Sequence, residues 1–369
     1  MTHQLGLFGD DPPPAARAVG PAEPSAEVVA TARRLPRGVL LGTSSWSFPG
    51  WTGLVWDREV SQRILAREGL RAYAEHPLHR TVGLDRTYYR SLPAGELRAY
   101  ADQVPDDFRF LVKADRLVTS PLDPASSSVR ERNPLFLDPR WAGEVVVEPL
   151  LRGMGPKAGP LLFQFSPFPA SLVDGPEAFA RRLGRFLEAL PAGPLYAVEL
   201  RTPGLLGEAY VAALRGAGAV HAYTMHPAMS PLDEQLRLLP PGEDGPLVVR
   251  WMLHAGLRYE AARDRYAPFD RLVDEDRPSR ESIAGAVAAA LEAGREAFVV
   301  VNNKAEGSAP RSVARLAERI VEVAGGPEQP AQPDGAGVAA AERSDGRPRR
   351  GRDGTGDAAG AAPGKGPGG

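Results

Sequence analysis

Eight short apolar segments are spread evenly over residues 38–324, and each ends at a polar side chain that suits a hydrophobic core poorly. We predict them to be strands, at residues 39–42, 81–84, 108–112, 161–163, 195–198, 220–223, 247–249 and 298–301. Helical patterns lie between most of them. Eight strand–helix units predict an α/β fold, a (β/α)8 TIM-type barrel, whose chemistry lies at the C-terminal ends of the strands.

The helical patterns bury one face each. In residues 176–190 the apolar side chains recur at one-face spacing, and in residues 309–324 a similar stripe follows Ser308, which we predict to cap the helix. The segment 254–278 has no clear period. Loops of that length in a compact domain are typical of lids or binding loops.

The barrel is expected to occupy residues 38–325. Residues 1–37 are predicted to be a flexible N-terminal tail, because 11–37 are rich in Pro, Ala and Arg. Residues 326–369 contain mainly Gly, Pro, Ala and charged side chains. Such a segment buries too little apolar surface to fold, so we predict a disordered C-terminal tail.

Composition narrows the class of protein. The chain is 43% hydrophobic and 24% charged with a net charge of −2, so no strong field favours nucleic acid or membranes. It has no cysteine, which excludes disulfides, thiolate zinc sites, iron–sulfur clusters and a cysteine nucleophile. Because neither an apolar run of about 18 residues nor a signal-peptide pattern is present, we expect a cytoplasmic protein with no membrane partner.

Three charged residues at strand ends are the candidate catalytic groups: Glu199, Lys113 and Asp85. Glu199 could act as a general acid or base, with a pKa raised by a dry barrel mouth, or form a structural ion pair with Arg201 or Lys113. Lys113 could neutralise an anionic substrate, act as an amine nucleophile, or pair with a carboxylate.

Further polar and aromatic residues near strand ends are candidate substrate-binding groups: Trp46, Tyr88, Gln164, Arg201, Arg250, Asn302 and Asn303. Amides suit hydroxyl recognition but also tie loops to the backbone, and aromatic rings stack on sugars or pack loops. His226 and His254 follow strands six and seven, but no ligand-spaced motif accompanies them. We therefore assign no metal site, and the cofactor stays open.

Six ordered motifs resemble the YecE-like family, domain of unknown function 72: residues 42–53, 85–89, 108–114, 159–165, 196–203 and 301–307. The resemblance covers roughly residues 38–322 and implies a TIM-type barrel, in agreement with the strand count. The family has no established activity. This chain reads Gly83-Leu84-Asp85 where the family usually carries Glu-Leu-Asn, and its seventh strand end is looser, which implies an altered substrate or lost activity.

The N-terminal peptide carries a second signal. Gln4-Leu5-Gly6-Leu7-Phe8 resembles the short Gln-Leu-x-Leu-Phe peptide by which bacterial polymerases and repair proteins bind the replication sliding clamp. Leu7 and Phe8 would fill an apolar pocket, Gln4 would bond its rim, and a flexible linker would supply reach. A pattern of five residues also arises by chance.

These observations leave three functions open. The first is an enzyme, a hydrolase, lyase or isomerase, acting on a small polyhydroxylated or phosphorylated substrate. The second is a DNA-maintenance protein recruited to the clamp, which a basic rim of Arg250, Arg258, Arg263 and Arg265 would favour. The third is a barrel that binds a ligand without catalysis.

Overall fold

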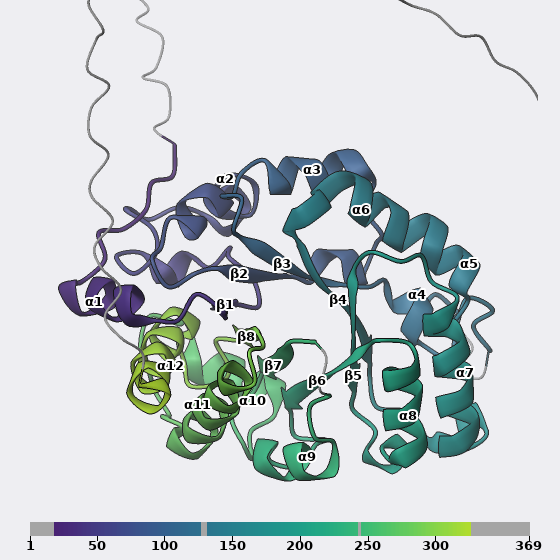
Figure 1. Ribbon diagram of the computed structural model, residues 1–369. Helices are drawn as coiled ribbons and strands as arrows, with labels where there is room; N and C mark the ends of the chain where they lie inside the picture. Colours follow the sequence, from purple (N-terminus) through teal and green to yellow (C-terminus); the bar gives the residue numbers. More distant parts are fainter. Residues whose placement is uncertain (1–17, 127–130, 243–244, 326–369) are drawn as a thin grey trace, which may run out of the picture. The chain divides into compact units, whose positions relative to one another are not determined.

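Eight parallel strands form a closed barrel in the computed structural model, which describes residues 18–126, 131–242 and 245–325 (Figure 1). Each strand pairs with the next, and the last pairs with the first. The strands are β1 (Val39–Thr43), β2 (Thr81–Leu84), β3 (Arg109–Lys113), β4 (Ala158–Phe165), β5 (Leu195–Leu200), β6 (Val220–Met225), β7 (Leu247–Trp251) and β8 (Ala297–Val301). The predicted (β/α)8 barrel is confirmed.

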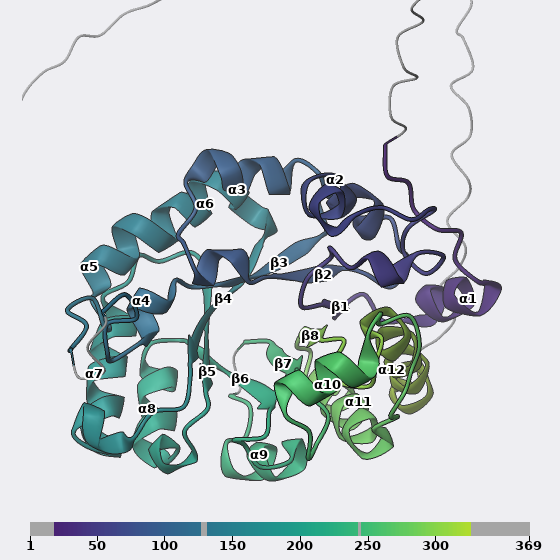
Figure 2. The same cartoon turned by 180° about the vertical axis from the view of Figure 1, so that it is seen from behind.

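Helices lie outside the ring of strands, as Figures 1 and 2 show from opposite sides. They are α1 (Ala26–Arg34), α2 (Gln62–Ala74), α3 (Ala94–Ala101), α4 (Arg116–Thr119), α5 (Pro139–Ala142), α6 (Glu148–Met154), α7 (Pro176–Glu188), α8 (Glu208–Gly216), α9 (Leu232–Leu238), α10 (Tyr259–Tyr266), α11 (Arg277–Glu292) and α12 (Ala309–Ala324). The apolar stripes predicted for 176–190 and 309–324 are buried in α7 and α12. Within the described ranges, no helix is long and apolar enough to cross a membrane.

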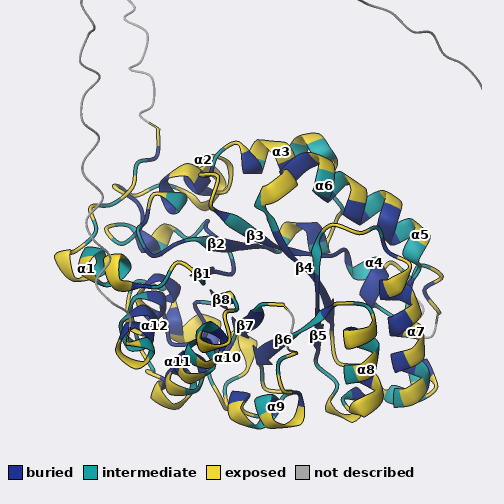
Figure 3. Cartoon of the chain, viewed as in Figure 1, coloured by how far each residue is buried: buried dark blue, intermediate teal, exposed yellow. Residues whose placement is uncertain are grey.

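The barrel has two apolar regions, and the buried strands are dark blue in Figure 3. The larger lies between the strands and the helices. The smaller fills the barrel interior below the C-terminal ends of the strands, with Leu40, Leu111, Leu162, Ala197, Ala222, Val248, Phe298 and Val300. Because strand side chains alternate in direction, residues two positions further along each of these strands also face the interior.

Two helices lie where the sequence predicted irregular chain. Part of the expected N-terminal tail forms α1, whose first turn is capped by the Ser25 hydroxyl accepting from the Val28 amide at 3.3 Å. Val28 and Ala32 pack against the main core. The segment 254–278 contains α10, which buries Ala262 and Tyr266 beside Leu253. Both helices are held by packing of a few apolar side chains, too few to give a clear period.

Candidate active site at the C-terminal end of the barrel

A ring of polar side chains lies one layer above the apolar barrel interior. We call it the polar layer; its members, one from the end of each strand in chain order, are Ser44, Asp85, Lys113, Gln164, Glu199, Thr224, Arg250 and Asn302. Asp85 faces inward because Val82 and Leu84 face outward into the main core. The sequence predicted six of these eight positions as site residues, and it left out Ser44 and Thr224, whose hydroxyls are common at strand ends.

Glu199 is fully buried between two arginines. Its Oε1 accepts from the Arg201 Nε at 2.5 Å, and its Oε2 accepts from the Arg250 Nη1. Burial raises the pKa of Glu199, but the two guanidiniums outweigh burial and lower that pKa to about 2. The raised pKa that we expected for Glu199 from the sequence takes only burial into account. The carboxylate therefore stays ionised at neutral pH and is unsuited to donating a proton.

Arg250 connects two carboxylates across the barrel. It is 1% exposed, and its Nη2 lies 3.7 Å from the Asp85 Oδ1, in addition to its bond with Glu199. The Arg250 Nε makes no hydrogen bond to any described residue. Asp85 is 37% exposed, so it lies on the open side of this charge network. The network extends from Arg201 through Glu199 and Arg250 to Asp85.

Lys113 is buried beside this network but outside its ion pairs. Its Nζ lies 3.7 Å from the centre of the Tyr88 ring, a cation–π contact. In the described ranges it has neither an ion pair within 4 Å nor a side-chain hydrogen bond. Burial lowers the pKa of Lys113 to about 8, with the nearby Arg250 and Arg201 lowering it and Asp85 and Glu199 raising it. The amine is thus partly neutral at mildly alkaline pH.

Neutral hydrogen-bonding groups flank the charges. The Asn302 Nδ2 donates to the Ser44 Oγ at 2.8 Å. Ser166, which follows β4, lies 3.4 Å from the Gln164 Nε2 and shares a hydrogen bond of 3.3 Å with the Tyr88 hydroxyl. Such amides and hydroxyls both donate and accept, which suits a ligand that carries hydroxyl groups.

Trp46 and Asn303, two of the predicted substrate-binding residues, lie outside the polar layer. Trp46 is buried, and its Nε1 donates to the Leu65 carbonyl at 3.1 Å. Asn303 is 1% exposed. Its side chain points out of the barrel towards the helix layer, because the side chain of its neighbour Asn302 faces the interior. The Asn303 Oδ1 accepts from the Trp51 Nε1 at 3.1 Å and from the Ala309 amide at 2.8 Å. Asn303 therefore caps α12, whereas Ser308, the predicted cap, makes no side-chain capping bond.

Replacing Asn303 by alanine should lower the free energy of unfolding by about 2–3 kcal/mol. The loss combines a helix cap with a Trp51 N–H left buried and unpaired. Urea denaturation followed by circular dichroism measures it. The matched control is Ser308→Ala, which should change stability by less than about 0.5 kcal/mol, because the buried Ser308 hydroxyl has no partner among the described residues. Equal effects of the two substitutions would contradict the capping role.

The arginines expected to form a basic rim are largely neutralised. Arg250 is buried against Glu199, Arg263 pairs with Asp264 at 2.8 Å, and Arg265 pairs with Asp274 at 2.7 Å. These pairs do not favour a nucleic-acid surface at the barrel mouth. No group of three or more histidine or carboxylate side chains in the described ranges is arranged to hold a metal ion.

Comparison with known proteins gives a family and a fold. A family model described as a protein of unknown function, DUF72, matches residues 40–336. A DUF72 family protein from Thermotoga maritima is 21% identical with a TM-score of 0.51, covering 76% of this chain and 98% of that one. One from Enterococcus faecalis is 18% identical with a TM-score of 0.50, covering 80% and 100%. No curated protein matches this chain.

Proposed function

Because this chain belongs to the DUF72 family, whose description assigns no activity, we propose its function from its own side chains. We propose an enzyme whose active site is the polar layer. Its substrate is a small molecule that carries several hydroxyl groups and one anionic group, a phosphate or a carboxylate. The reaction is a proton transfer by Lys113, as in an isomerase or a lyase.

The proposal rests on the environment of the Lys113 amine, which is buried and has a lowered pKa. A buried amine with a pKa near 8 and no carboxylate partner among the described residues is unusual, because burial of a lysine is costly unless it is paired or used. A neutral amine accepts a proton or attacks a carbonyl carbon, and its pKa lies close to the range in which a general base is most effective. The cation–π contact with Tyr88 holds the Nζ in place.

The charge of the polar layer, taken together with the adjoining Arg201, favours an anionic substrate. Lys113, Arg201 and Arg250 carry three positive charges when Lys113 is protonated, whereas Glu199 and Asp85 carry two negative ones. With Lys113 protonated, one positive charge is left, which favours binding of a substrate phosphate or carboxylate. When Lys113 is neutral the four remaining charges balance, and the amine regains its charge when it takes a proton from the substrate, so that it stabilises the negative charge that develops on this substrate. Gln164, Asn302, Ser44 and Tyr88 would bind its hydroxyl groups.

Glu199 acts in this proposal as a positioning residue that holds the two guanidiniums. A glycosidase needs a carboxylic acid with a raised pKa next to a second carboxylate. The pKa of Glu199 is lowered to about 2, so Glu199 and Asp85 do not match that pair. This disfavours glycoside hydrolysis and favours proton abstraction by the amine.

A ligand screen tests the proposal. The melting temperature of the wild type and of Lys113→Met is measured with sugar phosphates, sugar acids and uncharged sugars, and each hit is incubated at pH 8.5 and analysed by NMR for conversion. We expect hits among the anionic sugars only, with conversion by the wild type alone. Binding without conversion would favour a non-catalytic barrel instead. Hits that include neutral sugars would contradict the anionic substrate.

A second function rests on the N-terminal peptide. Gln4, Leu5, Leu7 and Phe8 lie outside the described residues, so their sequence alone supports recruitment to the sliding clamp. We expect the full chain to bind purified bacterial sliding clamp with micromolar affinity in a calorimetric titration, because two apolar anchors fill one pocket.

The double variant Leu7→Ala, Phe8→Ala should lose this binding, whereas Thr2→Ala, Asp10→Ala, which changes neighbouring residues outside the motif, should keep it. If both variants bind the clamp as the wild type does, the motif is not the attachment point. If the wild type does not bind at all, recruitment to the clamp is wrong.

A further inference from the structure

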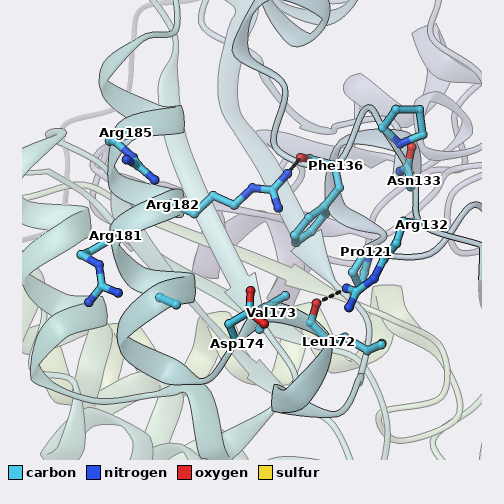
Figure 4. A pocket seen from close by; sticks show the side chains of 12 residues that line it. Pro121, Arg132, Asn133, Phe136, Leu172, Val173, Asp174, Arg181, Arg182 and Arg185 are labelled. Atoms are coloured by element: carbon cyan, nitrogen blue, oxygen red, sulfur yellow. Dashed lines mark hydrogen bonds between the residues drawn. The ribbon is translucent and has the colours of Figure 1, made fainter.

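An arginine-rich pocket shares no residue with the polar layer. It has a volume of about 490 Å³, and Figure 4 shows its lining. One wall is α7 with the residues just before it, and the other is formed by Pro121 and by residues 132–136. Four arginines line it: Arg132, Arg181, Arg182 and Arg185. We call it the arginine pocket.

Two of the arginines are held in place by the backbone. The Arg182 Nη2 donates to the Phe136 carbonyl at 2.5 Å, and its guanidinium lies 4.8 Å from the centre of the Phe136 ring. Arg132 donates to the Leu172 carbonyl, and both bonds are seen in Figure 4. Neither bond neutralises charge, because both acceptors are carbonyl oxygens. The two guanidiniums are therefore ordered and still positively charged.

The charges of the pocket are unbalanced. Asp174 is the one acidic residue that lines it, and none of the four arginines forms an ion pair with a carboxylate in the described ranges. Arg181 and Arg185 are four positions apart on α7, where like charges destabilise a helix. Burial is the largest cause of the lowered pKa of Arg182; the neighbouring Arg132 and Arg185 lower it further, and Asp174 partly offsets them. A repulsive cluster of this kind would be relieved by a bound anion.

We propose that the arginine pocket binds a phosphorylated small molecule. Guanidinium groups bind phosphate oxygens through paired, charge-assisted hydrogen bonds, and several arginines are needed to balance a phosphate with two or more charges. The volume lies within the range of small-ligand sites. The Asp174 carboxylate would accept a hydrogen bond from a hydroxyl of the same ligand. This site is additional to the active site proposed above, so its ligand could act as a regulator.

Calorimetric titration with sodium pyrophosphate and with ribose 5-phosphate tests this site on the full chain. The test variant is Arg181→Gln, Arg185→Gln, because these side chains are exposed and make no hydrogen bond in the described ranges. The control is Arg33→Gln, Arg34→Gln, which removes the same charge from exposed positions on α1. We expect at least about 10-fold weaker binding in the test variant and no change in the control.

Equal weakening in both variants, or none, would overturn the proposal, since binding would then follow overall charge. A third arm uses single-stranded oligonucleotides of two lengths. If these bind through Arg181 and Arg185 while the small phosphates do not, the pocket belongs to a nucleic-acid surface and the small-ligand proposal is wrong. Melting temperatures of both variants check that they are folded. Lys113 is unchanged throughout, so failure here leaves the proposed activity at the polar layer untouched.

Discussion

The Glu199→Gln variant is expected to lose about 3–5 kcal/mol of unfolding free energy. The substitution leaves the Arg201 and Arg250 guanidiniums without their carboxylate, and Arg250 is only 1% exposed. Breaking a buried ion pair by removing one partner strands a charge away from water, which costs far more than the pair contributes relative to an apolar replacement. Urea denaturation at pH 7 measures the loss.

The matched control is Glu144→Gln. Glu144 pairs with Arg140 at 3.1 Å in an exposed i,i+4 arrangement, with side-chain exposures of 58% and 87%. Water screens that pair, so its loss should cost less than about 0.5 kcal/mol. If Glu199→Gln were as mild as this control, the two arginines would have to find other partners, and the role of Glu199 in positioning them would be wrong.

The same ion pair predicts a pH dependence. The pKa of Glu199 is lowered to about 2 in the folded protein, whereas it is about 4.5 when the chain is unfolded. A carboxylate with a lowered folded pKa contributes stability that is present above the unfolded value and is lost as pH falls towards the folded one. The difference in unfolding free energy between wild type and Glu199→Gln should therefore shrink between pH 4.5 and 2. A constant difference would contradict the ionised buried carboxylate.

The sequence predicted the barrel and most of its polar layer because both follow from a simple periodicity. Apolar runs of strand length mark the strands, and a polar residue at the end of a buried strand, such as Gln164 or Glu199, has few structural reasons to be there. The alternation of strand side chains then separates Asn302, which faces the interior, from Asn303, which faces the helix layer. Applied to the last strand, that rule would have identified Asn303 as a structural residue.

The remaining features depend on contacts between distant segments, which no local pattern encodes. The pKa of Glu199 depends on Arg250, which is 51 positions away in the sequence. Burial alone would raise this pKa, and the contact with the arginines lowers it instead. Trp46 is buried because α2, which comes later in the chain, folds back against it, and the Trp46 Nε1 donates to the Leu65 carbonyl of that helix. The arginine pocket is lined both by residues of α7 and by Arg132, which is distant in the sequence. From its own sequence, α7 is an ordinary amphipathic helix with a charged outer face, so the pocket could not be predicted from it.

Replacing Lys113 by methionine should lower turnover of the substrate found in the ligand screen by about 10²–10⁴-fold. This is the usual contribution of a positioned general base. Methionine has a similar length and volume without the amine, and it avoids burying an unpaired charge. Lys113→Arg should be nearly as inactive, because a guanidinium keeps the positive charge but does not release its proton near pH 8. If Lys113→Arg kept most of the activity, Lys113 would bind the substrate anion and accept no proton.

The pH dependence of the wild type separates these roles further. Burial lowers the pKa of Lys113 to about 8, and a base acts in its neutral form, so kcat/KM should rise with pH and level off above that value. Labelling by acetic anhydride, followed by mass spectrometry of the Lys113 peptide, reports the same titration without any substrate. Half-maximal reactivity near pH 8 is expected, against about 10.4 for a free lysine side chain. A midpoint near that of free lysine would mean that Lys113 is protonated throughout the working range, and proton abstraction by this amine would be wrong.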